Sequence, residues 1–512
     1  MIHWLALPVV LPALLAPFIV LAARFHLPIQ RTLSVAGVVA LIGLAISLVW
    51  QTADGTVMLY QMGDWAAPFG IVLVGDRLST MMVLLTTVLA LVVLLYAIGS
   101  GWDARGQHFH ALFQFQLMGI IGAFLTGDAF NLFVFFEVLL IASYGLMIHA
   151  GGNARMKAGV QYVLFNLLGS TLFLFALGSI YAETGTLNMA DLAVRVQMLD
   201  ASESAGIRVA AVLLLLVFAI KAALVPLHFW LPSSYAEAPA PVAALFAIMT
   251  KVGAYAIIRI YTMVFPEALE VTAGLHHDWL LPFALISVVV GALGVIAAKK
   301  LDRLVAFAVI GSMGMVMVAI GQFTVISIGA ALYYMIHSTF AAALLFLVVD
   351  LTRSGRMNLN LTAQPAIAGA VLTSALFFVG AIAMTGLPPL SGFIGKLMIL
   401  QSGWESSLSP YIWAIVLGAS LVSVLGFARA GSTVYWKAKS VETPDDPATP
   451  PNPLAFAAVG MLVALLVATT VFAGTLHRHT LTIAEQLFTP TDYIETVLQT
   501  PGKLSKPQGD PQ

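Results

Sequence analysis

Five ionisable residues lie inside stretches of sequence that are otherwise apolar: Glu137, Lys221, Lys251, His337 and Lys396. Ionisable side chains at membrane depth are expensive, and they commonly mark the paths of ions and protons. Burial disfavours the charged form of such a group, whereas an opposite charge nearby favours it. A series of these groups can bind and release protons near neutral pH, so proton transfer is the chemistry that the sequence predicts.

Glu137 and Lys221 are predicted to act as a pair in which the charge on one changes the proton affinity of the other. Glu137 follows Asp128 by nine residues, or about 13 Å of helix, which places it near mid-bilayer. A purely structural pair with a neighbouring helix is the alternative. Lys221 precedes Pro226, and a proline breaks a helix because it lacks an N–H and clashes with the preceding turn. Broken helices in transporters line cavities and ion sites.

The other three residues are predicted to be successive stations for the proton. Lys251 follows Pro239 by twelve residues, or about 18 Å of helix. His337 lies halfway along an apolar stretch, where a hydrogen-bonded core histidine is the alternative. Lys396 follows the Gly- and Pro-rich run 386–392 by four residues, which predicts that it repeats the arrangement of Lys221. Hydrogen bonds reach only about 3 Å, so water must connect stations that lie farther apart.

Several further ionisable residues have a weaker claim to function. His228 lies just past the helix-breaking proline, where it is either a point of proton uptake or an interfacial residue. Asp128 and Asp350 fall at predicted helix ends, where water is near. His477 and His479 are predicted to be solvated.

Composition identifies the solvent that surrounds these groups. Hydrophobic residues make up 60% of the 512-residue chain and charged residues only 9%, against roughly 25% charged in soluble domains. A spanning helix needs about 20 mostly apolar residues. The sequence therefore predicts an all-α polytopic membrane protein with about fourteen spans, at 3–23, 32–50, 78–98, 108–127, 129–150, 159–181, 208–230, 239–262, 279–298, 302–321, 325–350, 365–403, 409–430 and 453–474.

Two of these spans, the seventh and the twelfth, are predicted to be discontinuous. The span 208–230 contains Pro226, and 365–403 is too long for one helix and holds two prolines at its centre. Broken helices at corresponding positions indicate inverted repeats with a site at their interface. The predicted organisation is an N-terminal three-helix segment, a first repeat, a second repeat, and a last part with a Pro- and Asp-rich loop, the final helix and a tail, at 1–107, 108–262, 279–430 and 431–512.

Charge distribution predicts the orientation. Cytoplasmic loops carry an excess of Lys and Arg. With both termini outside, thirteen of the 23 Lys and Arg residues fall in cytoplasmic loops and seven, Arg259 among them, in outer segments. The weakly amphipathic tail 481–498 either lies on the outer surface, contacts a partner or is frayed.

Several classes of function find no support. The chain has no Cys, which excludes disulfides, thiolate catalysis and Fe–S clusters. It has no phosphate-binding loop, no HExxH and no flavin or nicotinamide fingerprint, so neither a cofactor nor a metal is expected. Acidic clusters that would make a Na⁺ site inside a span are also missing, and nothing in the charge pattern suggests nucleic acid.

Two stretches carry a family resemblance. VFAIKAALVPLHFWLP at 217–232, continued by 236–239 and 251–255, and GLPPLSGFIGK at 386–396 resemble the antiporter-type membrane subunits that respiratory complex I shares with multisubunit Mrp (Mnh, Pha) cation/proton antiporters. The resemblance covers nearly the whole chain. It implies fourteen helices with the seventh and twelfth discontinuous, proton translocation in a bacterial plasma membrane, and functional roles for Glu137, Lys221, Lys251, His337 and Lys396.

Within that family, the chain resembles the D-type component of the Mrp complex. M-type subunits of complex I usually carry Glu at the position of Lys396. Longer A-type and L-type subunits commonly have a Lys shortly after the His, where this chain has Ala341 and Ala342. The resemblance implies A, B, C, E, F and G partner subunits and Na⁺ or K⁺ exchange. A proton-pumping subunit of a redox complex, either complex I or a membrane-bound hydrogenase, is the alternative, and a structural subunit without an ion path is a third reading.

Overall fold

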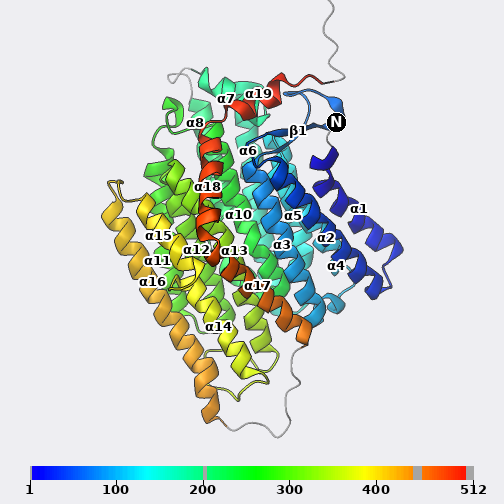
Figure 1. Cartoon of the computed structure of the whole chain (residues 1–512), viewed down its shortest axis with the longest axis vertical. Coiled ribbons are helices and arrows are strands. Elements are labelled where there is room, and N and C mark those ends of the chain that lie inside the picture. The colour runs from blue at the N-terminus through cyan, green and yellow to red at the C-terminus, as the bar shows by residue number, and fades with distance from the viewer. Residues whose placement is uncertain (1–2, 200–204, 442–451, 503–512) are drawn as a thin grey trace, which may run out of the picture.

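The structure is a computed structural model that describes residues 3–199, 205–441 and 452–502. Helices build almost all of it, and most of them run along the long axis of the molecule (Figure 1). Among the described residues, the helices are α1 (Leu7–Ala22), α2 (Leu27–Gln51), α3 (Arg77–Ser100), α4 (Phe109–Leu125), α5 (Ala129–Met147), α6 (Asn153–Thr184), α7 (Met189–Gln197), α8 (Ala205–Lys221), α9 (Trp230–Glu237), α10 (Ala240–Met263), α11 (Leu281–Ala297), α12 (Leu301–Ile320), α13 (Val325–Arg353), α14 (Ala370–Thr385), α15 (Ser391–Ser402), α16 (Ser409–Gly431), α17 (Pro453–Val471), α18 (Ala473–Phe488) and α19 (Thr491–Gln499).

The helices agree with the predicted membrane spans. Within the described ranges, ten helices are long and apolar enough to cross a membrane, and α1, α4 and α14 are shorter apolar helices. Each of the fourteen predicted spans overlaps one or two helices. The all-α membrane fold is thereby confirmed, while the number of crossing segments stays a prediction.

Both predicted helix breaks are present. In the first, α8 ends at Lys221 and α9 begins at Trp230, whose indole nitrogen donates to the Ile220 carbonyl at 3.0 Å. In the second, α14 ends before Gly386, and α15 begins at Ser391. Gly386 has φ of 77°, the left-handed conformation that ends many helices and that glycine adopts without a Cβ penalty.

A short antiparallel hairpin lies between α2 and α3, and the sequence interpretation did not include it. Strand β1 (Met58–Gln61) pairs with β2 (Val72–Gly75). All four residues of β2 are buried, and Leu73 also pairs with Thr126 at the end of α4. Strands this short have too few residues for an alternating pattern to stand out.

The C-terminal tail is folded through residue 502. Helix α18 packs against α13, and α19 packs against α7 (Figure 1, red). The amide of Gln486 donates to the Gly55 carbonyl at 2.8 Å, and that of Gln61 donates to the Thr500 carbonyl at 2.9 Å. A frayed tail is therefore wrong for these residues, which cover the end of the molecule that carries β1 and β2. His477 and His479, which were predicted to be solvated, lie half-buried in α18.

The two described ends of the chain lie at the same end of the molecule (Figure 1). We call it the hairpin end, and we call the opposite end, where α3 and α13 finish, the basic end. The basic end carries Arg31, Arg105, Arg155, Arg353 and Arg429. The loop that includes Thr443 to Pro447 lies outside the described residues.

Candidate functional site

Helix α6 lies between the first two predicted residues and contacts both. Ser170 donates its hydroxyl hydrogen to the Glu137 carboxylate, and Lys221 donates from Nζ to Asn166 Oδ1 at 3.1 Å. Asn166 and Ser170 are four residues apart and therefore share one face of α6. Glu137 and Lys221 form no ion pair with each other in the described structure, so the predicted pair is linked through α6 instead. Sequence reasoning did not find Asn166 or Ser170, because polar uncharged residues are common in membrane helices.

Lys251 lies on α10, which packs against the end of α8 at the first break. Its side chain is fully buried, and its Nζ has no hydrogen-bond partner among the described residues. A Cβ at Gly253 would lie 2.8 Å from the Ala222 nitrogen and 3.1 Å from the Lys221 carbonyl carbon. Gly253 therefore lets the end of α8 approach α10 closely, which brings the backbone of Lys221 against the helix that carries Lys251.

His337 contacts the second break. Its Nδ1 lies 2.9 Å from the Ser391 hydroxyl, the first residue of α15, while its buried Nε2 has no partner in the described structure. A Cβ at Gly392 would lie 2.8 Å from that Nε2 and would clash with the Ala383 carbonyl oxygen. The imidazole therefore depends on a glycine in order to sit against the break.

Lys396 reaches back across the second break. Its Nζ donates to the Thr385 carbonyl at 2.6 Å and to the Ser420 hydroxyl at 2.8 Å. Thr385 ends α14, and the C-terminal end of a helix carries partial negative charge that favours a cation. The arrangement differs from that of Lys221, which ends the first half of its broken helix, whereas Lys396 belongs to the second half. The prediction that one arrangement repeats the other was wrong in this respect.

His228 lies in the non-helical segment between α8 and α9. Only 8% of it is exposed, its ring packs on Phe229, and its Nδ1 has no partner among the described atoms.

Asp128 has a structural role, because its carboxylate caps α5 by accepting from the Asn131 N–H at 2.8 Å.

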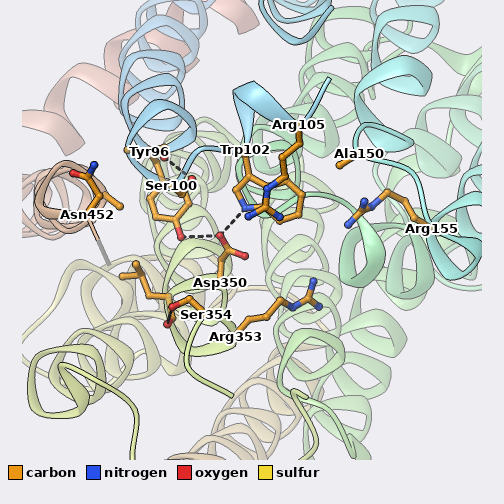
Figure 2. Close-up of a pocket in the computed structure, with 13 residues that line it drawn as sticks. Tyr96, Ser100, Trp102, Arg105, Ala150, Arg155, Asp350, Arg353, Ser354 and Asn452 are labelled. Carbon is orange, nitrogen blue, oxygen red and sulfur yellow. Dashed lines mark hydrogen bonds between the residues drawn. The ribbon is translucent and has the colours of Figure 1, made fainter. Parts of the chain in front are cut away.

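Asp350 is not freely solvated at its helix end. Its Oδ2 accepts from the Tyr96 hydroxyl at 2.9 Å and from the Trp102 indole nitrogen at 2.7 Å (Figure 2). The carboxylate thereby joins the last turn of α13 to the end of α3. Arg353 and Arg105 lie on either side of it.

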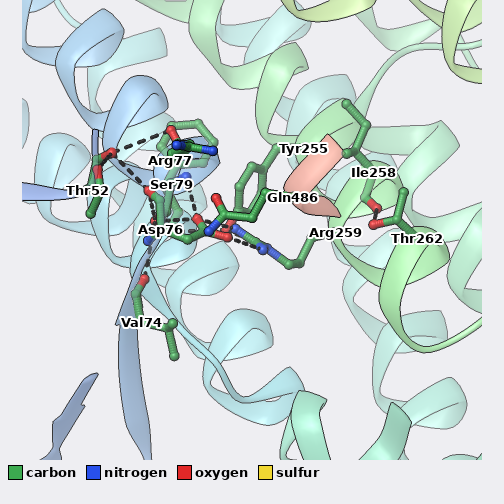
Figure 3. Close-up of polar contacts among 12 residues, drawn as sticks. Thr52, Val74, Asp76, Arg77, Ser79, Tyr255, Ile258, Arg259, Thr262 and Gln486 are labelled. Carbon is green, nitrogen blue, oxygen red and sulfur yellow. Dashed lines mark hydrogen bonds and ion pairs between the residues drawn. The ribbon is translucent and has the colours of Figure 1, made fainter. Parts of the chain in front are cut away.

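A buried ion pair at the hairpin end was missed from the sequence. Arg259, predicted in an outer segment, is 4% exposed on α10, two turns beyond Lys251. Its two terminal nitrogens donate to the Asp76 carboxylate at 2.6 and 2.7 Å (Figure 3). Asp76 also caps α3 by accepting from the Ser79 N–H at 2.9 Å. Burial alone raises the pKa of Asp76, but the charge and hydrogen bonds of Arg259 outweigh it and hold that pKa below its usual range.

Comparison with known proteins gives consistent matches. Residues 126–423 match the family described as NADH:quinone oxidoreductase/Mrp antiporter, transmembrane. The chain is 34% identical to the D component of a probable K⁺/H⁺ antiporter of Rhizobium meliloti, over 98% of each chain. It is 35% identical to the D component of a Na⁺/H⁺ antiporter of Alkalihalophilus pseudofirmus, over 96% of this chain and 99% of that one. A chain in the Mrp complex from Dietzia sp. superposes with a TM-score of 0.87 at 27% identity, over 97% and 100% of the two chains.

Proposed function

The chain belongs to the NADH:quinone oxidoreductase/Mrp antiporter family of membrane subunits, and on that premise we propose that it is the D-type subunit of a multisubunit monovalent cation/proton antiporter. Its part is to move protons. The observation that carries the proposal is that ionisable groups stand at both helix breaks and on the helices packed against them, with Lys221, Lys251 and His337 buried and the other two half-buried. Five ionisable groups at membrane depth argue against a subunit without an ion path, because each is costly to place there.

In the proposed path, the proton passes along Glu137, Lys221, Lys251, His337 and Lys396. Asn166 and Ser170 connect the first two, so a change of charge at Glu137 is felt at Lys221 through one face of α6. Lys251 and His337 each keep a buried nitrogen without a protein partner, and such nitrogens bind water, which can carry the proton between them. Lys396 ends the path with its ammonium held by the end of α14.

The remaining assignments follow from the same proposal. The basic end faces the bacterial cytoplasm and both termini face outward, as the positive-inside rule requires. Residues 108–262 and 279–430 are the two inverted repeats, and His228 is a second site of proton exchange with water. The partners are the A, B, C, E, F and G subunits. The names of the relatives divide between K⁺ and Na⁺, and we propose that the cation crosses elsewhere in the complex.

The test is cation-driven collapse of a pH gradient in everted vesicles that contain the whole complex. We expect Na⁺ or K⁺ to collapse the gradient with the unaltered complex and not with Lys221→Ala. Lys157→Ala, an exposed lysine at the basic end, is the matched control and should exchange normally. Assembly of each variant is checked by purifying the complex through another subunit.

Each other outcome has a definite meaning. If Lys221→Ala assembles and exchanges as the unaltered complex does, the proposed proton path is wrong. If the unaltered complex shows no cation response, the redox-pump alternative replaces the antiporter. If the purified subunit exchanges Na⁺ by itself in liposomes, the cation does not cross elsewhere.

A further inference from the structure

A large cavity opens at the basic end, away from the five groups of the proposed path. Its volume is about 660 Å³, and it lies between the ends of α3 and α13, the start of α6 and the start of α17 (Figure 2). Its polar lining includes Ser100, Trp102, Arg105, Arg155, Asp350 and Arg353. A water molecule needs about 10 to 15 Å³ of such a volume, so the cavity has room for many of them.

In the described structure, one carboxylate oxygen of Asp350 accepts no hydrogen bond. Both of its hydrogen bonds, from Tyr96 and Trp102, end on Oδ2, and neither uses Oδ1. Figure 2 shows the carboxylate between Trp102 and Arg353, facing the open space. Because the two donors are neutral, they hold the side chain in place without neutralising its charge.

Three guanidinium groups face the same cavity, and each is engaged with other partners. Arg105 stacks on the Trp102 ring at 3.9 Å, and Arg353 bonds to Asp302 at 3.3 Å. Arg155 donates to the backbone carbonyls of His149, Gly151 and Glu237. None of the three hydrogen-bonds to Asp350 in the described structure, so no fixed ion pair removes this carboxylate from proton exchange.

A second, smaller cavity adjoins Asp350 on the inner side. Its volume is about 20 Å³, enough for one water, and it shares Asp350 and Arg353 with the large cavity. Its other lining residues include Ala243 on α10 and Phe346 on α13. Ala243 precedes Lys251 by eight residues, so about 12 Å of α10 separates the small cavity from the buried lysine.

We propose that Asp350 is the group through which the proton path exchanges protons with water at the basic end. A proton arriving from the interior through the small cavity forms an O–H bond at Oδ1. It is then given to water in the large cavity, which restores the carboxylate, and the reverse transfer runs through the same two steps. The bonds from Tyr96 and Trp102 stay in place throughout, because they use the other oxygen. The inference rests on the proposed function and extends it to a residue that belongs to neither broken helix.

The experiment uses the whole complex in everted vesicles, whose outer medium reaches the basic end if that end is cytoplasmic. Asp350→Asn keeps an oxygen for Tyr96 and Trp102 but cannot bind and release a proton. We expect cation-driven exchange to slow by about tenfold or more with the half-saturating cation concentration unchanged. Added formate, small enough to enter the large cavity, should restore most of the rate, after subtraction of the gradient decay without cation.

Two further variants separate proton exchange from a structural tie between α3 and α13. Asp350→Glu keeps the carboxylate and should retain most of the activity. Ala243→Val narrows the small cavity without touching Asp350, so it should slow exchange in a way that formate does not restore. Asp103→Asn is the matched control, a buried carboxylate at the same end that bonds to Arg31 and His110 and lines neither cavity.

The outcomes decide between the inference and the function on which it rests. If the unaltered complex exchanges and Asp350→Asn exchanges equally fast, the inference is overturned and the proposed function stands. If Asp350→Asn is slow but formate has no effect, the residue is a structural tie and the inference is again overturned. If Asp350→Asn does not assemble, a normal rate in Ala243→Val overturns it. If the unaltered complex does not exchange, the proposed function fails and takes the inference with it.

Discussion

Helix α10 carries two buried basic residues, Lys251 and Arg259, that differ in their partners and in their protonation chemistry. Lys251 has no protein partner within the described structure, whereas Arg259, two turns farther along, is held by both oxygens of Asp76. Tyr255 and Tyr493 enclose the guanidinium, with their rings 5.4 and 5.3 Å away. Arginine stays protonated in proteins, while lysine changes its protonation state readily when buried. The comparison indicates that the partner and the chemistry of the side chain, rather than burial, distinguish Arg259, which is fixed in an ion pair, from Lys251, a station of the proton path that we propose.

The largest effect is expected from breaking the fixed pair. Arg259→Gln leaves the Asp76 carboxylate buried without a cation, which should destabilise the subunit by about 3 to 5 kcal/mol. Thermal unfolding of the purified complex, followed in this subunit, measures the loss. Asp76→Asn combined with Arg259→Gln should recover part of it, because no charge is then left unpaired. Arg24→Gln, an exposed arginine, is the control, and an equal loss there would contradict the prediction.

Removing Lys251, the basic residue without a partner, should slow cation exchange and leave the stability of the complex unchanged. Lys251→Met deletes a proton station but leaves no partner behind, so the complex should keep its stability. Exchange should fall by about a hundredfold, the usual range for loss of a proton-transfer group. Everted vesicles give the rate, and thermal unfolding gives the stability. The prediction is contradicted if Lys251→Met lowers the unfolding temperature as Arg259→Gln does, or if it exchanges at the normal rate.

Lys221 provides an intermediate case, because its partner is the neutral amide of Asn166. Asn166→Leu should slow exchange by about tenfold, or about 1.4 kcal/mol in the barrier. Lys221 itself remains, so the effect should be smaller than that of Lys251→Met. Asn188, which caps α7 and touches none of the five groups, supplies the control as Asn188→Ser. Rates within twofold of each other in the two variants would show that α6 does not connect Glu137 with Lys221.

The smallest effect concerns pH at the hairpin end. Because the pKa of Asp76 is lowered in the folded state, its ionised form stabilises the fold at pH values above its unfolded pKa of about 3.9. This contribution is lost as pH falls through the folded pKa. The difference in unfolding temperature between the unaltered subunit and Asp76→Asn should therefore be constant from pH 7 to 5 and narrow below about pH 4. A difference that widens on acidification would contradict the lowered pKa.

The sequence was sufficient to predict the membrane helices, both helix breaks and the burial of Lys221 and Lys251. Long apolar stretches leave few other structures open to the backbone in lipid, and Pro226 cannot continue a helix. The hydrogen-bond and ion-pair partners of the buried groups were less predictable from the sequence. Asp76 and Arg259 are 183 residues apart, and no local pattern joins them. Asp76 with Ser79 is a capping pattern at the start of a predicted span, and that signal was available to identify the aspartate as a helix cap.

Lys221 and Lys396, the two lysines at the helix breaks, also show that the sequence predicts positions better than it predicts contacts. Each was predicted from its distance to a proline, and both lie at their breaks. The sequence did not predict which half of each broken helix carries the lysine, because that depends on the residue at which the helix resumes. Polar bridges such as Asn166 and Ser170 carry no charge and follow no period, so only the packing of α5, α6 and α8 reveals them.

The position of Tyr493 also has a consequence for how the chain is made. The ring that encloses Arg259 belongs to α19, which the ribosome synthesises after every other helix of the described chain. Asp76 and Arg259 therefore enter the membrane long before the segment that shields them exists. Until α19 is made, the guanidinium has only one of the two rings that enclose it in the folded chain. A chain that ended before α19 would lack the Tyr493 ring over this charged pair.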